Sequence, residues 1–284
     1  MMTKMFLRIY YIARGRRLMI YREVEIGNAV LRTYVLSNYP NIDMERRRAF
    51  ILICPGGGYH FCSEREAEAV AIRFNSLGYN AAIIYYTCNP TGEGHREEGI
   101  FPEPQDELAR AVAWIRCNAD ELNTDPHKIA VLGFSAGGHL AASLGVFWPE
   151  YGIMSRPDAL VLCYSVITSG EYAHRGSIDN LIGNRTALLE KVSLEKQVTK
   201  QTPPTFLWTT RTDQSVPYQN STMFAQALSR CGVTNQIHIY DDGVHGLSLG
   251  TREVMNPGRP VNLSVADWPE RADAFLQSVM GTVF

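Results

Sequence analysis

Short apolar runs alternate along this chain with segments of helical periodicity, and no other feature of the sequence constrains the fold as strongly. Ala49–Cys54 and Ile129–Phe134 are two such runs, and each has the length of a strand that is buried on both faces. A strand of that kind belongs to a parallel sheet that helices cover on both sides. The chain is therefore predicted to form a mostly parallel sheet flanked by helices, in the α/β class.

The remaining elements follow from the same patterns. Further strands are predicted at Tyr21–Ile26, Ala29–Leu36, Ala81–Tyr86, Ala159–Val166, Thr205–Thr210 and Gln236–Tyr240. Helices are predicted from Ser63 to Leu77 and at Phe101–Asn123, Ala136–Phe147, Asn220–Cys231 and Ala266–Met280. No helix separates the first two strands, so we expect antiparallel pairing at one edge of the sheet.

The start of the first helix carries a two-residue signal. Ser63 is followed three residues later by Glu66, which is the spacing of a capping box. In that motif each side chain accepts a hydrogen bond from the backbone amide of the other residue. We therefore predict that Ser63 and Glu66 cap this helix.

One polar stretch interrupts the alternation of strands and helices. Thr168–Pro204 lies between two predicted strands and is too long for a plain connection. Its helical pattern is weak and lies around Ala187–Val198. We predict a small cap inserted around residues 168–204, over the carboxyl end of the sheet. Residues 21–284 are predicted to form a single domain, and residues 1–20 an N-terminal extension whose order the sequence does not decide.

Composition argues against several classes of partner. The formal net charge of −2 gives no reason to expect a nucleic acid. No apolar run reaches the ~18 residues of a membrane span, and basic residues break the apolar stretch within residues 1–20, so we expect neither a membrane partner nor a signal peptide. The six cysteines have no metal or redox spacing, and several lie in apolar runs. Reduced core thiols and a cytoplasmic location are therefore expected.

The sharpest chemical signal is the pentapeptide Gly133-Phe134-Ser135-Ala136-Gly137, which matches G-x-S-x-G. A predicted buried strand precedes it and an alanine-rich helix follows, as the motif requires. Glycines at both ends let a tight, strained turn form without crowding its neighbours. Such a turn lifts the serine hydroxyl clear of the backbone, so Ser135 is the predicted nucleophile.

A serine hydroxyl is a poor nucleophile at neutral pH and needs a base. Among the seven histidines, His245 follows the last predicted strand in a glycine-containing loop, and it is the predicted base. Asp213 follows the strand Thr205–Thr210 and is the predicted anion that orients the imidazole. Asp241 and Asp242 are alternatives, but they lie only a few residues before His245 on the same segment. Serine, aspartate and histidine thus occur in the order expected after a strand-to-helix nucleophile turn.

Backbone amides that can stabilise an oxyanion are predicted at two places. Gly57 and Gly58 lie directly after a strand, in Pro55-Gly56-Gly57-Gly58-Tyr59, where no side chain blocks the approach to their amides. Ala136 lies at a helix start, where the helix dipole adds to the effect. No Gly-Lys-Ser/Thr follows the glycines, so this is not a phosphate loop. No ligand cluster is apparent, and we expect neither a metal nor an organic cofactor.

Together these segments resemble the α/β-hydrolase esterases of the hormone-sensitive-lipase and acetyl-esterase type. The likeness extends from about Arg22 to the end and rests on the two glycine motifs, Asp213–Pro217 and Gly243-Val244-His245-Gly246-Leu247. It looks closest to the bacterial branch labelled acetyl-xylan esterase-like, which resembles this chain in having proline at the position of Pro55, where many relatives have histidine. The resemblance implies the α/β-hydrolase fold and makes His139 a helix-packing position.

Residues that contact the substrate are predicted from their place beside these motifs. Tyr59 and His60 follow the glycine loop, Ser165 and Val166 follow a strand at its carboxyl end, and His174 lies in the predicted cap. The resemblance implies hydrolysis of small-acyl, acetyl-type carboxylic esters, with acetylated sugars among the candidate substrates. A serine peptidase of the prolyl-oligopeptidase type and a non-catalytic ligand-binding homologue are the alternatives. The expected partner is a small ester, and a homodimer is left open.

Overall fold

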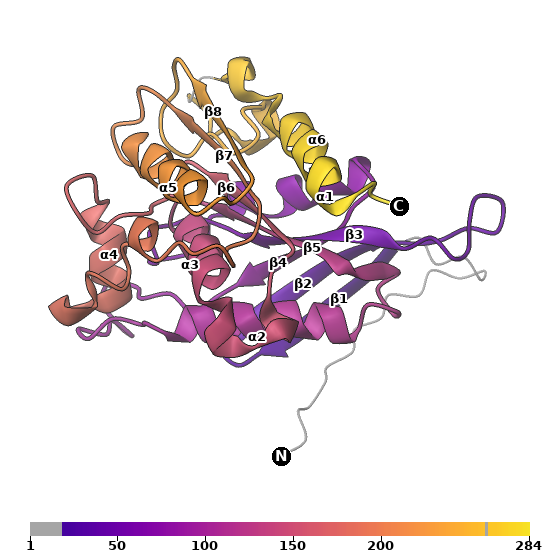
Figure 1. Cartoon of the computed structure of the whole chain (residues 1–284), viewed down its shortest axis with the longest axis horizontal. Helices are drawn as coiled ribbons and strands as arrows, with labels where there is room; N and C mark the ends of the chain where they lie inside the picture. The colour runs from indigo at the N-terminus through magenta and orange to yellow at the C-terminus, as the bar shows by residue number, and fades with distance from the viewer. Residues whose placement is uncertain (1–18, 259–260) are drawn as a thin grey trace.

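Within residues 19–258 and 261–284, which the computed structural model describes, eight strands form one sheet in the order β1-β2-β4-β3-β5-β6-β7-β8 (Figure 1). The strands are β1 (Met19–Ile26), β2 (Ala29–Leu36), β3 (Arg48–Cys54), β4 (Asn80–Tyr85), β5 (Thr124–Phe134), β6 (Ala159–Cys163), β7 (Thr205–Thr210) and β8 (Asn235–Tyr240). β2 pairs antiparallel with β1 and with β4, and the other pairs are parallel. The predicted mixed sheet is therefore confirmed.

The predicted extension over residues 1–20 falls mostly on residues 1–18, which lie outside the described residues. Met19 and Ile20 belong to β1 and pair with β2, so the sheet begins before the predicted domain boundary at residue 21. At the other end of a strand, β6 stops at Cys163 rather than at the predicted Val166. Tyr164 has a φ of +38°, and this left-handed residue turns the chain out of the sheet.

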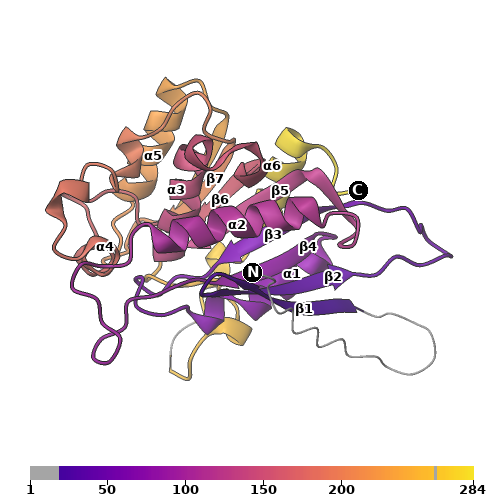
Figure 2. The same ribbon diagram turned by 90° about the horizontal axis from the view of Figure 1, so that it is seen from below.

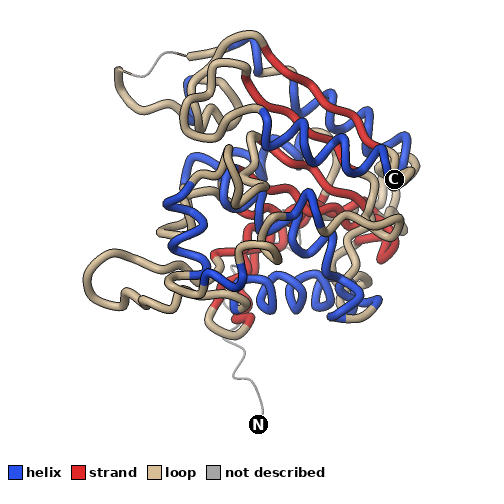
Figure 3. The backbone as a smooth tube through the Cα atoms, turned by 60° about the vertical axis from the view of Figure 1, so that its left-hand side comes forward, coloured by secondary structure: helices blue, strands red, loops and turns tan. Residues whose placement is uncertain are grey.

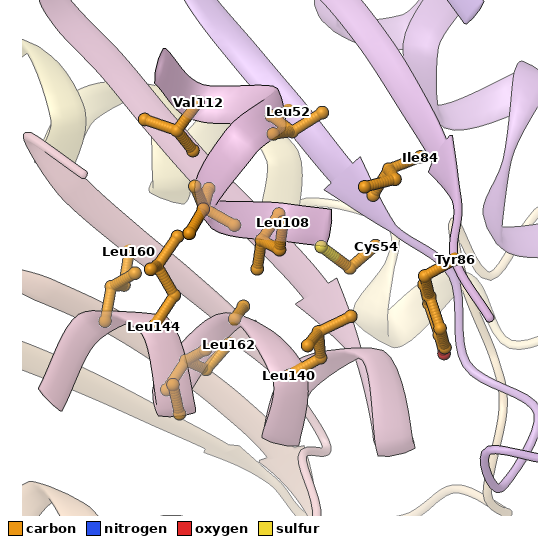
Figure 4. Close-up of a cluster of buried hydrophobic side chains, with 14 of the residues drawn as sticks. Leu52, Cys54, Ile84, Tyr86, Leu108, Val112, Leu140, Leu144, Leu160 and Leu162 are labelled. Atoms are coloured by element: carbon orange, nitrogen blue, oxygen red, sulfur yellow. The ribbon is translucent and has the colours of Figure 1, made fainter. Parts of the chain in front are cut away.

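The described chain has six α-helices, which are α1 (Glu68–Ser76), α2 (Glu103–Cys117), α3 (Ser135–Tyr151), α4 (Arg175–Ile182), α5 (Gln219–Arg230) and α6 (Trp268–Met280). Of these, α4 lies in the insertion between β6 and β7, and the other five cover the two faces of the sheet (Figure 3). Successive residues of a strand point to opposite faces, so β3 sends Leu52 toward α2 and α3 (Figure 4) and Ile51 toward α1 and α6. Both residues are fully buried, which is why this strand reads as a continuous apolar run.

The segment between β6 and β7 forms the predicted insertion, but its helix lies elsewhere. The predicted helix at Ala187–Val198 is wrong: this segment contains two short 3-10 turns, and the α-helix of the insertion is α4. Tertiary hydrogen bonds also hold this segment: the Leu194 amide donates to the Ile167 carbonyl, and the Ser193 hydroxyl accepts the Ser169 amide. Figure 2 shows α4 at the end of the molecule where α3 and α5 also lie.

None of the described helices combines the length and hydropathy that a membrane crossing requires. The six cysteines are free thiols. Cys54 and Cys163 are buried in the sheet as expected, whereas Cys117 is exposed.

Candidate active site

Ser135 lies at the sharp turn between β5 and α3, and its φ of +51° is strained for a residue with a side chain. The flanking glycines make this turn fit. A Cβ on Gly133 would collide with the backbone of Gly137, and a Cβ on Gly137 would collide with the carbonyl oxygen of Cys54. The turn therefore depends on backbone contacts that only glycine permits.

A chain of two hydrogen bonds connects the three predicted catalytic residues. The Ser135 Oγ lies 2.8 Å from His245 Nε2, and His245 Nδ1 lies 2.7 Å from Asp213 Oδ2. The other carboxylate oxygen, Asp213 Oδ1, accepts the backbone amides of Ser215 and Val216, each at 2.9 Å. Because the carboxylate can only accept from the imidazole, His245 carries its proton on Nδ1 and presents Nε2 as an acceptor to the serine hydroxyl.

The two alternative aspartates lie at the surface. The side chain of Asp241 is 98% exposed and faces Arg211 at 4.0 Å. Asp242 accepts the Thr212 hydroxyl at 2.7 Å. The geometry at His245 therefore favours Asp213, whose side chain is only 1% exposed.

The glycine loop after β3 packs directly against the nucleophile. A Cβ on Gly56 would lie 3.0 Å from the Ser135 Cβ. Gly57 and Gly58 have φ values of +123° and +67°, and among the described residues their amides donate to no protein acceptor. Ala136 is the second residue of α3, where backbone amides have no acceptor within the helix. The amides of Gly57, Gly58 and Ala136 are thus available to an anion.

The insertion packs over this loop through α4. Asn180 on α4 donates its side-chain amide to the Gly58 carbonyl at 2.9 Å. His174 caps the helix, and its Nδ1 accepts the Ser177 amide and lies 2.8 Å from the Ser177 hydroxyl. Burial lowers the pKa of His174, and the nearby His245 lowers it further. The carboxylate of Asp213 opposes this fall, so His174 lies within electrostatic reach of both the predicted base and its aspartate.

The other predicted substrate contacts divide into buried and accessible residues. Ser165 and Val166 are fully buried, and Tyr59 is 1% exposed with its hydroxyl 2.9 Å from His139 Nδ1. These three side chains pack inside the protein. His60 is half-buried with Nδ1 3.3 Å from the Asn89 carbonyl, so His60 and His174 are the predicted contacts that retain accessible surface.

His139 is fully buried, in keeping with a packing position. Its Nε2 lies 3.0 Å from the Val192 carbonyl, and burial lowers its pKa to about 4. The ring therefore connects the glycine loop, through Tyr59, to the insertion.

Glu66 is the residue whose role the sequence concealed. The predicted capping box is wrong, because Ser63 makes no side-chain cap and Glu66 points into the protein instead. Its Oε2 accepts the Gly56 amide at 2.8 Å, and its Oε1 accepts the Tyr164 hydroxyl at 2.7 Å. Burial raises the pKa of Glu66, and these two hydrogen bonds oppose the rise. Tyr164 was not predicted either, since it reads as the continuation of a strand.

Within residues 19–258 and 261–284, no group of three or more His, Cys, Asp or Glu side chains is arranged to hold a metal ion. The chemistry that the arrangement can support is nucleophilic: a serine hydroxyl hydrogen-bonded to an imidazole, a carboxylate that orients this imidazole, and backbone amides able to donate to an anion.

Comparison with known proteins identifies relatives. A family model described as the prolyl oligopeptidase family matches residues 68–257. Endo-1,4-beta-xylanase B of Butyrivibrio fibrisolvens is 38% identical over 217 residues, and the match covers 73% of this chain and 34% of that protein. An acetylxylan esterase of Xylanibacter ruminicola is 28% identical over 205 residues, with 69% and 40% covered. The chain thus spans between a third and two-fifths of the length of these two relatives.

A solved structure matches over nearly the full length of both chains. It is an acetyl ester-xyloside bifunctional hydrolase from Caldicellulosiruptor lactoaceticus, with a TM-score of 0.76, 34% identity and 89% of each chain covered.

Proposed function

Because this chain belongs to the prolyl oligopeptidase family of α/β-hydrolases, we propose that it hydrolyses carboxylic esters of small acyl groups with Ser135 as the nucleophile. The observation that carries the proposal is the hydrogen-bonded chain from Ser135 through His245 to Asp213. The names of the relatives support an ester substrate, since two of them act on acetyl esters.

In the first half of the reaction, Ser135 Oγ attacks the ester carbonyl carbon while His245 Nε2 takes the hydroxyl proton. The carbonyl electron pair moves onto oxygen, and the amides of Gly57, Gly58 and Ala136 stabilise the resulting oxyanion. Asp213 stabilises the imidazolium. When the tetrahedral intermediate collapses, the alcohol leaves with the proton from His245, and the acyl group remains on Ser135.

In the second half, His245 takes a proton from water, and the hydroxyl oxygen attacks the acyl carbon. The same amides stabilise the second oxyanion. Collapse breaks the bond to Ser135 Oγ, which regains its proton from His245, and the carboxylic acid is released. No metal or organic cofactor takes part in this scheme.

Features around the serine support a polar alcohol group in the ester. The insertion packs over the glycine loop through Asn180. His60 and His174 keep accessible surface beside it, and we assign them to the alcohol side of the ester. An acetylated sugar offers hydroxyl groups that such imidazoles can bind. Acetylated xylo-oligosaccharides are therefore the first natural substrates to test.

A prolyl peptidase is the second candidate, because the matching family model describes such enzymes. The test compares p-nitrophenyl acetate, butyrate and octanoate with a blocked prolyl p-nitroanilide, with Ser135→Ala as the blank. We expect the highest kcat/KM on acetate, a decline with chain length and no anilide cleavage. Anilide cleavage at a rate comparable to that of acetate would instead make the chain a peptidase.

A further inference from the structure

The buried carboxylate of Glu66 joins two segments that lie beside the proposed active site. The glycine loop meets it through the Gly56 amide, and the carboxyl end of β6 meets it through the Tyr164 hydroxyl. The same tyrosine oxygen accepts the Ser248 amide at 2.9 Å, three residues after His245. Glu66 is 98 residues from Tyr164 in sequence, so this junction forms only in the folded chain.

On the loop side, the contacts run directly to the nucleophile. A Cβ on Gly56 would lie 2.7 Å from Glu66 Oε2 and 3.0 Å from the Ser135 Cβ. The Gly56 backbone is therefore enclosed between the carboxylate and the serine. A shift of Glu66 Oε2 would change the position of Gly56, and with it the next two residues, Gly57 and Gly58.

On the histidine side, the contact runs through the Tyr164 ring. The ring packs edge-to-face against the His245 imidazole with centroids 5.1 Å apart and planes at 74°. The loop after His245 is further fixed by Arg65, which donates to the Gly246 carbonyl at 3.1 Å. The Arg65 carbonyl accepts the Ser248 hydroxyl at 2.7 Å. Tyr164 thus contacts the imidazole of the predicted base, and Arg65 holds the loop that follows it.

We propose that Glu66 is a positioning residue for acyl transfer at Ser135: its two oxygens bind the glycine loop and, through Tyr164, the His245 loop to one buried anchor. The oxyanion donors and the base then keep their separation during the reaction. This inference rests on the proposed roles of Ser135 and His245, but it does not depend on which ester is the substrate.

A carboxylate suits this place because both of its oxygens accept. The Gly56 amide and the Tyr164 hydroxyl are both donors, and the tyrosine oxygen already accepts from Ser248. A glutamine at position 66 keeps the volume but offers one acceptor and one donor group. One of the two donors then loses its acceptor, and the corresponding loop relaxes away from its place.

The test uses Glu66→Gln, with Glu64→Gln as the matched control because Glu64 is exposed two residues away. The first readout is the rate at which a fluorophosphonate labels Ser135, which requires nucleophile, base and oxyanion donors but no natural substrate. The second is kcat and KM for p-nitrophenyl acetate, both expressed per active site titrated. Circular dichroism and the thermal midpoint report folding.

We expect Glu66→Gln to fold, to titrate fully and to lose ~10–100-fold in labelling rate and in kcat, with KM within about 2-fold, as for a misplacement of the order of 1 Å. Glu64→Gln should match the wild type. Tyr164→Phe should lose a similar factor, and the double variant should lose little more than either single one, because both act through one junction.

Unchanged rates per titrated site in Glu66→Gln would overturn the proposal, and so would a loss confined to the titre, which marks a merely structural role. If Glu66→Gln does not fold, Tyr164→Phe decides by the same two criteria. A wild type that is labelled but hydrolyses no ester would contradict the proposed function, and the labelling rates would still test the role of Glu66.

Discussion

Gly57→Ala should disable the proposed oxyanion donors through a backbone collision. Gly57 has a φ of +123°, and an added Cβ would touch the Phe61 carbonyl oxygen and lie 2.8 Å from its carbon. Ordinary contacts of a Cβ begin at 3.4 Å, so the carbon alone requires a separation of about 0.6 Å and the nearer oxygen requires more. The Gly57 carbonyl also accepts the His60 and Phe61 amides, so the whole turn has to move.

The expected effect follows from the narrow range of useful donor distances. Oxyanion donors act at about 2.7–3.1 Å, and losing one costs ~10²–10³ in kcat, or about 2.7–4 kcal/mol. A displacement larger than that range should bring Gly57→Ala to at least the lower figure, a ~10²-fold loss. The left-handed backbone conformation should also lower the free energy of unfolding by about 1–3 kcal/mol.

Two other glycines separate collision from backbone strain. Gly92 has a φ of +81° with nothing within 4 Å of an added Cβ, so Gly92→Ala should lose stability but no activity. Gly58→Ala should be intermediate, because its Cβ would meet only the Ser177 Oγ at 3.7 Å. The assay is kcat on p-nitrophenyl acetate beside urea unfolding. Wild-type kcat in Gly57→Ala, or an equal loss in Gly92→Ala, would refute the reasoning.

Three further changes test the site and the core. Asp213→Asn should lower kcat by ~10³–10⁴-fold, whereas Asp241→Asn, at a surface aspartate, should leave kcat unchanged. Equal effects of the two variants in kinetic assays would show that the wrong anion was assigned. Burial lowers the pKa of His139 from 6.5 to about 4, so the folded state binds its proton less readily than the unfolded state. The free energy of unfolding should therefore fall by up to ~3 kcal/mol as the pH drops from 6.5 toward 4. Urea titrations of His139→Gln should lack that part of the fall. An identical pH dependence in the variant and the wild type would contradict the role of His139. Arg116→Ala removes an ion pair whose arginine is 9% exposed and should lower the free energy of unfolding by about 3 kcal/mol. Arg47→Ala, whose arginine is 44% exposed, should lower it by less than about 1 kcal/mol. Equal shifts of the thermal midpoint in the two variants would contradict the argument from burial.

Features written in local sequence were predictable. The turn at Ser135 depends on glycines at fixed offsets, and the structure has the φ of +51° that such a turn demands. The order of apolar runs predicted the sheet, and only strand ends such as that of β6 at Cys163 differed. Asp213 and His245 could be proposed because each follows a strand that ends at the same edge of a parallel sheet, and the structure brings them together.

Features that depend on tertiary partners were not predictable. Glu66 matches a capping box locally, but partners at Gly56 and Tyr164 outcompete that motif once the sheet forms. A position beside a motif also does not reveal which way a side chain points. Ser165 follows a strand at its carboxyl end, yet it lies against Gly138 of α3 and is fully buried.

Trapping the acyl-enzyme tests the central claim most directly. The protein is mixed with p-nitrophenyl acetate, quenched in acid during turnover, digested and analysed by mass spectrometry. The account predicts an acetyl group on the peptide that contains Ser135 and its absence, together with the loss of turnover, in Ser135→Ala. An acetyl group on another residue of a protein that turns over, or turnover by Ser135→Ala at the wild-type rate, would contradict it.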